Sequence, residues 1–123
     1  MSLADIQAAF RAQAIHCNNL GSPFTARLCT LLADRLGESG AVAHHLANWP
    51  GTASHRADAV PLRLAGGLHA LVLQGRESAL QAAYPPHMVD DDTLWAAIAR
   101  ALDRHAPFLL DWLKSPPQTN EVR

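Results

Sequence analysis

The sequence has little of what usually reveals a protein's chemistry. Its two cysteines among 123 residues are too few for a disulfide framework. Charged residues make up 17% and the formal net charge is −1, so nothing drives the chain toward nucleic acid. The longest apolar run, residues 59–73, is too short to span a membrane and includes Arg63 and His69. The N-terminal stretch MSLADIQAAF lacks the basic start of a signal peptide. We therefore expect no nucleic-acid or membrane partner and a cytoplasmic location.

Motifs for catalysis are missing too. The sequence contains no GxSxG, no glycine-rich phosphate loop and no HExxH. No two of its seven histidines have the i, i+3 or i, i+4 spacing that places metal ligands on one helix face. Three adjacent aspartates, residues 90–92, are more typical of a helix start than of a cation site, because a calcium loop also needs a glycine and a glutamate. We expect no catalytic residue, no metal site and no cofactor in this chain.

What the sequence does contain is helical periodicity. Apolar residues recur every three or four positions, and prolines and glycines mark the boundaries between segments. Serine at position 22 is a candidate cap and Pro23 a first helical residue. Pro107 must kink or split the last helix. The pattern predicts an all-α, single-domain bundle of about six helices around one core, over residues 1–114. The expected segments are residues 6–20, 23–36, 41–48, 61–75, 77–84 and 90–114.

Cys17 and Cys29 fall on successive predicted helices at different distances from the turn between them. That offset fits a disulfide poorly and favours buried free thiols. The segment PLRLAGGLHALVLQG, residues 61–75, is apolar on nearly all sides, which is typical of a central helix. Its adjacent glycines, Gly66 and Gly67, predict either a close helix crossing or a break in the helix.

The same helix carries His69, which needs a hydrogen-bond partner if it is buried there. A structural role is the simpler interpretation and a functional one the alternative. The chain then closes with SPPQTNEVR, residues 115–123, where two prolines precede a polar stretch. Its composition is that of a frayed tail, but a stiff segment carrying Gln118, Asn120, Glu121 and Arg123 could also bind a partner.

Several stretches resemble a known family when they are taken in order. They are QAIHCNNLGSPFTARL, NWPG, DAVPLRLAGGLHALVLQG, YPP and SPPQTNEVR. Together they resemble the N-terminal part of an uncharacterised bacterial family, domain of unknown function 2332. In that family a further region follows, and its glycine-rich stretch resembles the first nucleotide-binding turn of S-adenosylmethionine-dependent methyltransferases.

The resemblance implies that this chain is the front domain of a larger protein, with residues 115–123 as the hinge toward a missing C-terminal domain. S-Adenosylmethionine would then bind only in full-length relatives. The chain would act as a helical accessory domain, with Gln118, Asn120, Glu121, Arg123, Arg63 and His69 as candidate binding residues. The alternative is a stand-alone interaction module. If the chain is such a severed domain, a bare apolar face around Trp95, Leu109 and Trp112 predicts a homodimer.

Overall fold

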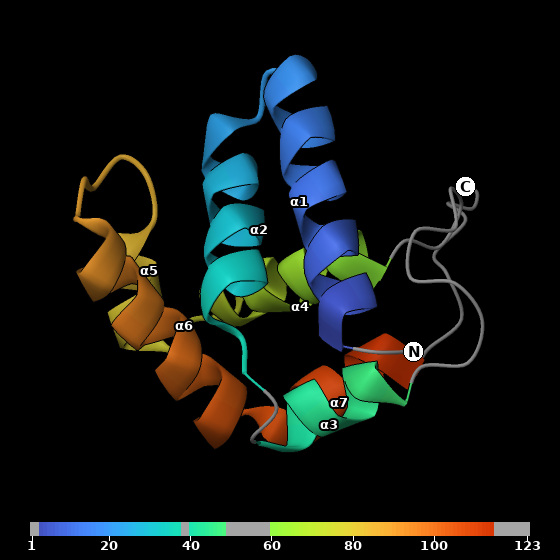
Figure 1. Ribbon diagram of the computed structural model, residues 1–123. Helices are drawn as coiled ribbons and strands as arrows, with labels where there is room; N and C mark the ends of the chain where they lie inside the picture. Colours follow the sequence, from blue (N-terminus) through green and yellow to red (C-terminus); the bar gives the residue numbers. More distant parts are fainter. Residues whose placement is uncertain (1–2, 38–39, 49–59, 115–123) are drawn as a thin grey trace, which may run out of the picture.

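A computed structural model describes residues 3–37, 40–48 and 60–114, and these residues form seven helices without a strand (Figure 1). The all-α prediction is therefore confirmed. The helices are α1 Leu3–Asn19, α2 Pro23–Arg35, α3 Ala41–Ala47, α4 Val60–Leu73, α5 Ser78–Ala83, α6 Asp91–Arg104 and α7 Ala106–Lys114.

The seventh helix arises because Pro107 splits the last predicted segment. α6 ends at Arg104, His105 adopts a non-helical conformation, and α7 begins at Ala106. Proline has no N–H to donate to the preceding turn, and its ring collides with that turn's carbonyl. As the second residue of a new helix it disturbs nothing, because the first N–H groups of a helix have no partner within it.

α1 and α2 stand side by side as an antiparallel hairpin (Figure 1). The turn uses Gly21 at φ 82°, a conformation that favours glycine, and the Ser22 N–H donates to the Cys17 carbonyl at 2.8 Å. Ser22 occupies the N-cap position of α2, as the sequence predicts, but its hydroxyl makes no capping hydrogen bond. The start of α2 is set instead by Pro23, whose fixed φ already suits a helix.

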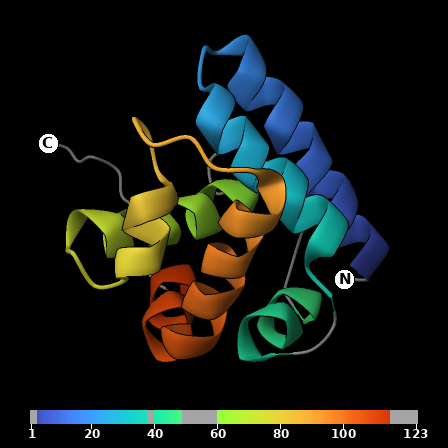
Figure 2. The same ribbon diagram turned by 90° about the vertical axis from the view of Figure 1, so that its left-hand side faces the viewer.

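α4 is the central helix, as its composition predicts. It runs across the α1–α2 hairpin and also contacts α5 and α7 (Figures 1 and 2). Leu64, Leu68 and Leu71 are completely buried and belong to the hydrophobic core. Within the described ranges, no helix is long and apolar enough to cross a membrane.

Both cysteines are buried free thiols, as the sequence predicts. Burial raises the pKa of the Cys29 thiol to about 12, with a smaller contribution from nearby Cys17. Because the thiolate is the reactive form, Cys29 is inert at neutral pH and serves the core as a small apolar side chain.

Candidate functional site

The two glycines of α4 mark a close crossing with α7, in an unbroken helix. A Cβ atom on Gly67 would lie 2.9 Å from Leu109 Cδ2 and 3.3 Å from Trp112 Cδ1. A Cβ on Gly66 would meet Trp112 Nε1 at an ordinary 3.5 Å. The close-crossing prediction is confirmed, but Gly67 alone makes it necessary.

Arg63 of α4 also holds the C-terminal end of α7 at this crossing. Its guanidinium Nη1 donates to the Leu113 carbonyl at 2.7 Å, next to the last residue of α7. The final carbonyls of a helix lack partners within it and attract positive charge. A candidate binding residue from the sequence thus helps to hold α7 against α4.

His69 lies one helical turn from the glycines and is partly buried. Its Nδ1 is 2.6 Å from the Tyr84 hydroxyl, and the edge of the Tyr84 ring also packs on Phe24, with centroids 4.6 Å apart. Burial lowers the pKa of His69, so the ring is neutral at pH 7. Burial also raises the pKa of Tyr84, which keeps the hydroxyl protonated as a donor to Nδ1. The predicted hydrogen bond is confirmed, and it ties α4 to the residue that follows α5.

The outward side of α4 forms an exposed apolar surface, here named the α4 stripe: Leu62, Gly66, His69 and Leu73 at spacings of four, three and four, with Trp112 of α7 beside Gly66. Leu62 is 51% exposed, Leu73 86% and Trp112 36%. Large apolar side chains aligned on one face of a rigid helix are more typical of an interface than single exposed leucines are.

The bare face expected around Trp95, Leu109 and Trp112 is therefore only partly right. Leu109 is fully buried in the crossing with Gly67 and contributes nothing to the surface. Trp95 is half-buried and belongs to a different region, so Trp112 is the one member on the α4 stripe. Their spacing in the sequence predicted that the three residues share one helix face. The break at Pro107 separates α7 from α6, so they do not.

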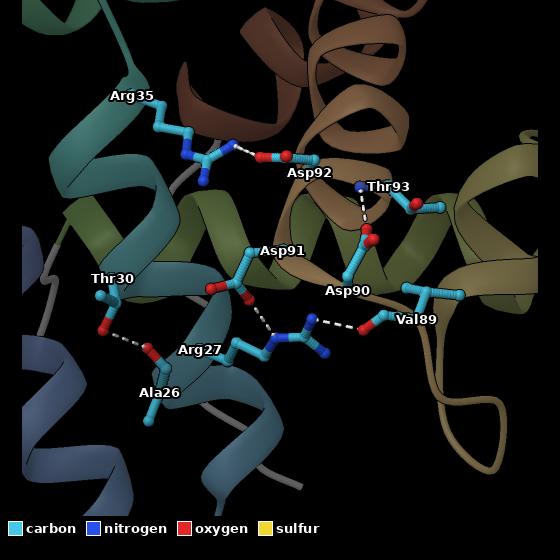
Figure 3. A network of polar contacts seen from close by, with 9 residues as sticks. All are labelled: Ala26, Arg27, Thr30, Arg35, Val89, Asp90, Asp91, Asp92 and Thr93. Atoms are coloured by element: carbon cyan, nitrogen blue, oxygen red, sulfur yellow. Dashed lines mark hydrogen bonds and ion pairs between the residues drawn. The ribbon is translucent and has the colours of Figure 1, made fainter.

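The aspartate run starts α6, as the sequence favours. Asp90 is the capping residue, and its carboxylate accepts from the Thr93 N–H at 2.7 Å (Figure 3). Hydrogen bonds from Thr93 lower the pKa of Asp90. Asp91 and Asp92 occupy the first turn, where negative charge is favourable. Across residues 3–37, 40–48 and 60–114, no group of three His, Cys, Asp or Glu side chains is arranged to hold a metal ion.

Two arginines of α2 form hydrogen bonds and ion pairs with residues at the start of α6 (Figure 3). Arg27 Nε lies 2.7 Å from Asp91, while its Nη2 donates to the Val89 carbonyl. Arg35 lies 2.8 Å from Asp92. We call these contacts the α2–α6 clasp. They join helices far apart in sequence at the protein surface.

A hollow of about 530 Å³ lies between the end of α2, α3 and α6. Trp95 gives it an aromatic wall, and Arg35 and Asp103 place opposite charges at its edge. The volume suits a small ligand. Arg35 is already paired with Asp92, however, which leaves the hollow without a convergent set of polar groups.

Glu77 is the residue that the sequence analysis missed. It is 1% exposed, and its carboxylate accepts from the Ala79 N–H at 3.3 Å, so it caps α5. His105 Nε2 lies 3.2 Å from Oε1, Arg104 3.7 Å from Oε1 and Arg100 3.4 Å from Oε2. A single glutamate in a short connection gave little signal. Arg100 and Arg104, four residues apart and so on one helix face, were the available clue.

The remaining predicted binding residues, Gln118, Asn120, Glu121 and Arg123, lie outside the described residues. Of the two inside, Arg63 and His69 sit on the same helix but reach different neighbours, α7 and Tyr84. The structure therefore gives both residues a role in holding α4 to its neighbours and does not bring them together as one polar site.

No curated protein and no solved structure matches this chain. A family model does: "Uncharacterized protein conserved in bacteria (DUF2332)", over residues 7–123. The match covers nearly the whole chain and confirms the family suggested by the sequence stretches quoted above. The chain therefore belongs to the DUF2332 family.

Proposed function

We propose that this chain is a helical accessory domain of a larger, methyltransferase-like protein and has no catalytic centre of its own. The α4 stripe is the surface that docks onto the neighbouring domain. The observation that carries this proposal is the row of exposed apolar side chains, Leu62, Leu73 and Trp112, on two helices that cross closely at Gly67.

Rigidity supports this role. α4 packs against α1, α2, α5 and α7, and α7 is held on it by the Gly67 crossing and by the Arg63 bond to Leu113. A docking surface on such elements loses little conformational freedom when it binds. His69, the polar member of the stripe, and Arg63 are both hydrogen-bonded within the fold, which favours a surface that acts by shape and apolar contact.

The place of α7 favours a neighbouring domain of the same protein as the occupant. Trp112 stands on the α4 stripe only two residues before the end of α7. A domain joined beyond this helix would start beside the stripe, and a short tether gives it a high effective concentration there. Residues 115–123 would act as the hinge, and S-adenosylmethionine would bind in the neighbouring domain.

The test begins with the coding sequence after codon 123, where we expect an in-frame second domain. Leu73→Glu and Leu62→Glu should then lower the melting temperature of the longer protein but leave that of the 123-residue chain almost unchanged. Met88→Glu is the matched control, since Met88 is also a large, exposed apolar residue but lies between α5 and α6.

Absence of such a reading frame, or equal effects of both changes on chain and longer protein, would contradict the accessory role. Saturable binding of S-adenosylmethionine to the 123-residue chain would also contradict it. A second copy of the chain could cover the same stripe, as the predicted homodimer requires. Light scattering would reveal this as a dimer mass that Leu73→Glu converts to a monomer mass, and the stand-alone module would then be the better description.

A further inference from the structure

We propose that a second surface of this chain binds the phosphate group of a small ligand, through Arg100 and Arg104. This surface, here named the arginine corner, comprises Arg76, Glu77, Arg100, Arg104 and His105. It lies where the connection from α4 to α5 meets the end of α6 and the start of α7. It shares no residue with the α4 stripe.

The charge of the arginine corner is opposite to that of the whole protein. Arg100 and Arg104 contact the Glu77 carboxylate, and Arg76 is the neighbour of Glu77 in the sequence. Three arginines and one glutamate leave two positive charges in excess, without counting His105. The chain as a whole carries −1. Arg76 is held nearby, because its Cζ stacks 4.5 Å from the centre of the Phe108 ring in α7.

The carboxylate orients the arginines without using up their donors. Both Glu77 oxygens already accept closer hydrogen bonds, from Ala79 and from His105. Arg100 and Arg104 approach at 3.4 and 3.7 Å, longer than the roughly 2.7–2.9 Å of a direct charge-assisted bond. Their side chains are 56% and 53% exposed. Each guanidinium has five N–H donors, so most of them face solvent.

This arrangement fits a phosphate group better than other anions. Arg100 and Arg104 are four residues apart and therefore share one face of α6, anchored on the two oxygens of a single carboxylate. Guanidinium forks match the spacing of phosphate oxygens, and a phosphate monoester carries roughly −1.5 to −2 charges near pH 7, which balances the excess. The buried Glu77 limits the freedom of both side chains before the ligand arrives. A nucleic acid would need basic residues spread along a surface, and the negative net charge argues against one.

The experiment titrates inorganic pyrophosphate into the isotope-labelled 123-residue chain at constant ionic strength, followed by NMR. We expect saturable shifts of the Arg100 and Arg104 side-chain N–H signals. The double change Arg100→Gln and Arg104→Gln should weaken binding by at least about tenfold, because two charge-assisted hydrogen-bonding groups are lost. Arg11→Gln is the matched control, since Arg11 is similarly exposed and pairs with Asp34 on a different part of the fold, and it should leave the affinity unchanged.

Shifts that do not saturate, or that sodium chloride reproduces, would overturn the proposal. So would equal affinity in the double variant and the wild type. Should the double variant unfold because Glu77 is left without cations, Arg100→Lys with Arg104→Lys keeps both charges and removes the forks. A several-fold loss of affinity there supports the site, and an unchanged affinity refutes it.

Discussion

The α4–α7 crossing and the α2–α6 clasp both join helices far apart in sequence, but by opposite means. The crossing is apolar and closed: a Cβ on Gly67 would come within 2.9 Å of the buried Leu109 side chain. The clasp is polar and open, with Arg35 and Asp92 paired at 2.8 Å while the aspartate is exposed. Packing inside a filled core tolerates little change, whereas exposed ion pairs exchange readily with water and salt. The crossing should therefore dominate stability.

The largest effect is expected from Gly67→Leu. The added side chain has no room against Leu109 and Trp112, and such overpacking costs about 1–3 kcal/mol of unfolding free energy. Urea denaturation measures it. Gly66→Ala is the matched control: its Cβ meets only an ordinary contact, so the better helix propensity of alanine should stabilise by up to about 1 kcal/mol. Equal effects at both positions would show that the crossing is looser than described.

A smaller loss is expected from Tyr84→Phe, which removes one hydroxyl and keeps the ring on Phe24. His69 Nδ1 would lose its partner in a partly buried site, at a cost of about 1–2 kcal/mol. Thermal unfolding followed by circular dichroism measures the change. An unaltered melting temperature would mean that water replaces the hydroxyl. Water would then reach α4 more easily beside Tyr84 than at its crossing with α7.

The same histidine predicts a pH dependence. Burial lowers the pKa of His69 below its ordinary 6.5, so on acidification the unfolded chain takes up a proton before the folded one does. The free energy of unfolding should therefore fall as the pH drops through about 6.5 toward the lower pKa of the folded state. Burial also lowers the pKa of His45, which acts in the same direction.

Urea denaturation at about pH 7.5 and about pH 5.5 measures this dependence across the ordinary titration range of histidine. His69→Gln should reduce the difference between the two values and leave the contribution of His45. If His69→Gln leaves the pH dependence as large as in the wild type, the imidazole is not sheltered from water.

The smallest effect is expected from Arg35→Ala in the clasp. An exposed ion pair of this kind contributes about 0.2–1 kcal/mol, and salt screens it. The loss measured by urea denaturation should shrink further in about 0.5 M sodium chloride. A salt-insensitive loss as large as that of Gly67→Leu would invert the comparison and make the clasp a structural centre.

The sequence by itself determined the elements of this protein. Apolar residues at every third or fourth position predict the helices. Pro107 ends α6 because it has no N–H to donate to the preceding turn. The adjacent Gly66 and Gly67 predict the close approach of a neighbouring helix. The aspartates at 90–92 start a helix for a local electrostatic reason. The family could also be recognised from the sequence, because the quoted stretches are distributed over nearly the whole chain.

Only the tertiary structure decided which residues meet. It made Gly67 the tight glycine and left room at Gly66, and it buried Leu109 while leaving Trp112 on the α4 stripe. It also gathered Arg100, Arg104 and His105 around Glu77, a lone carboxylate that no local pattern distinguishes. Periodicity fixes the face of one helix, but partners depend on how helices pack across it, and that packing is settled by contacts between distant parts of the chain.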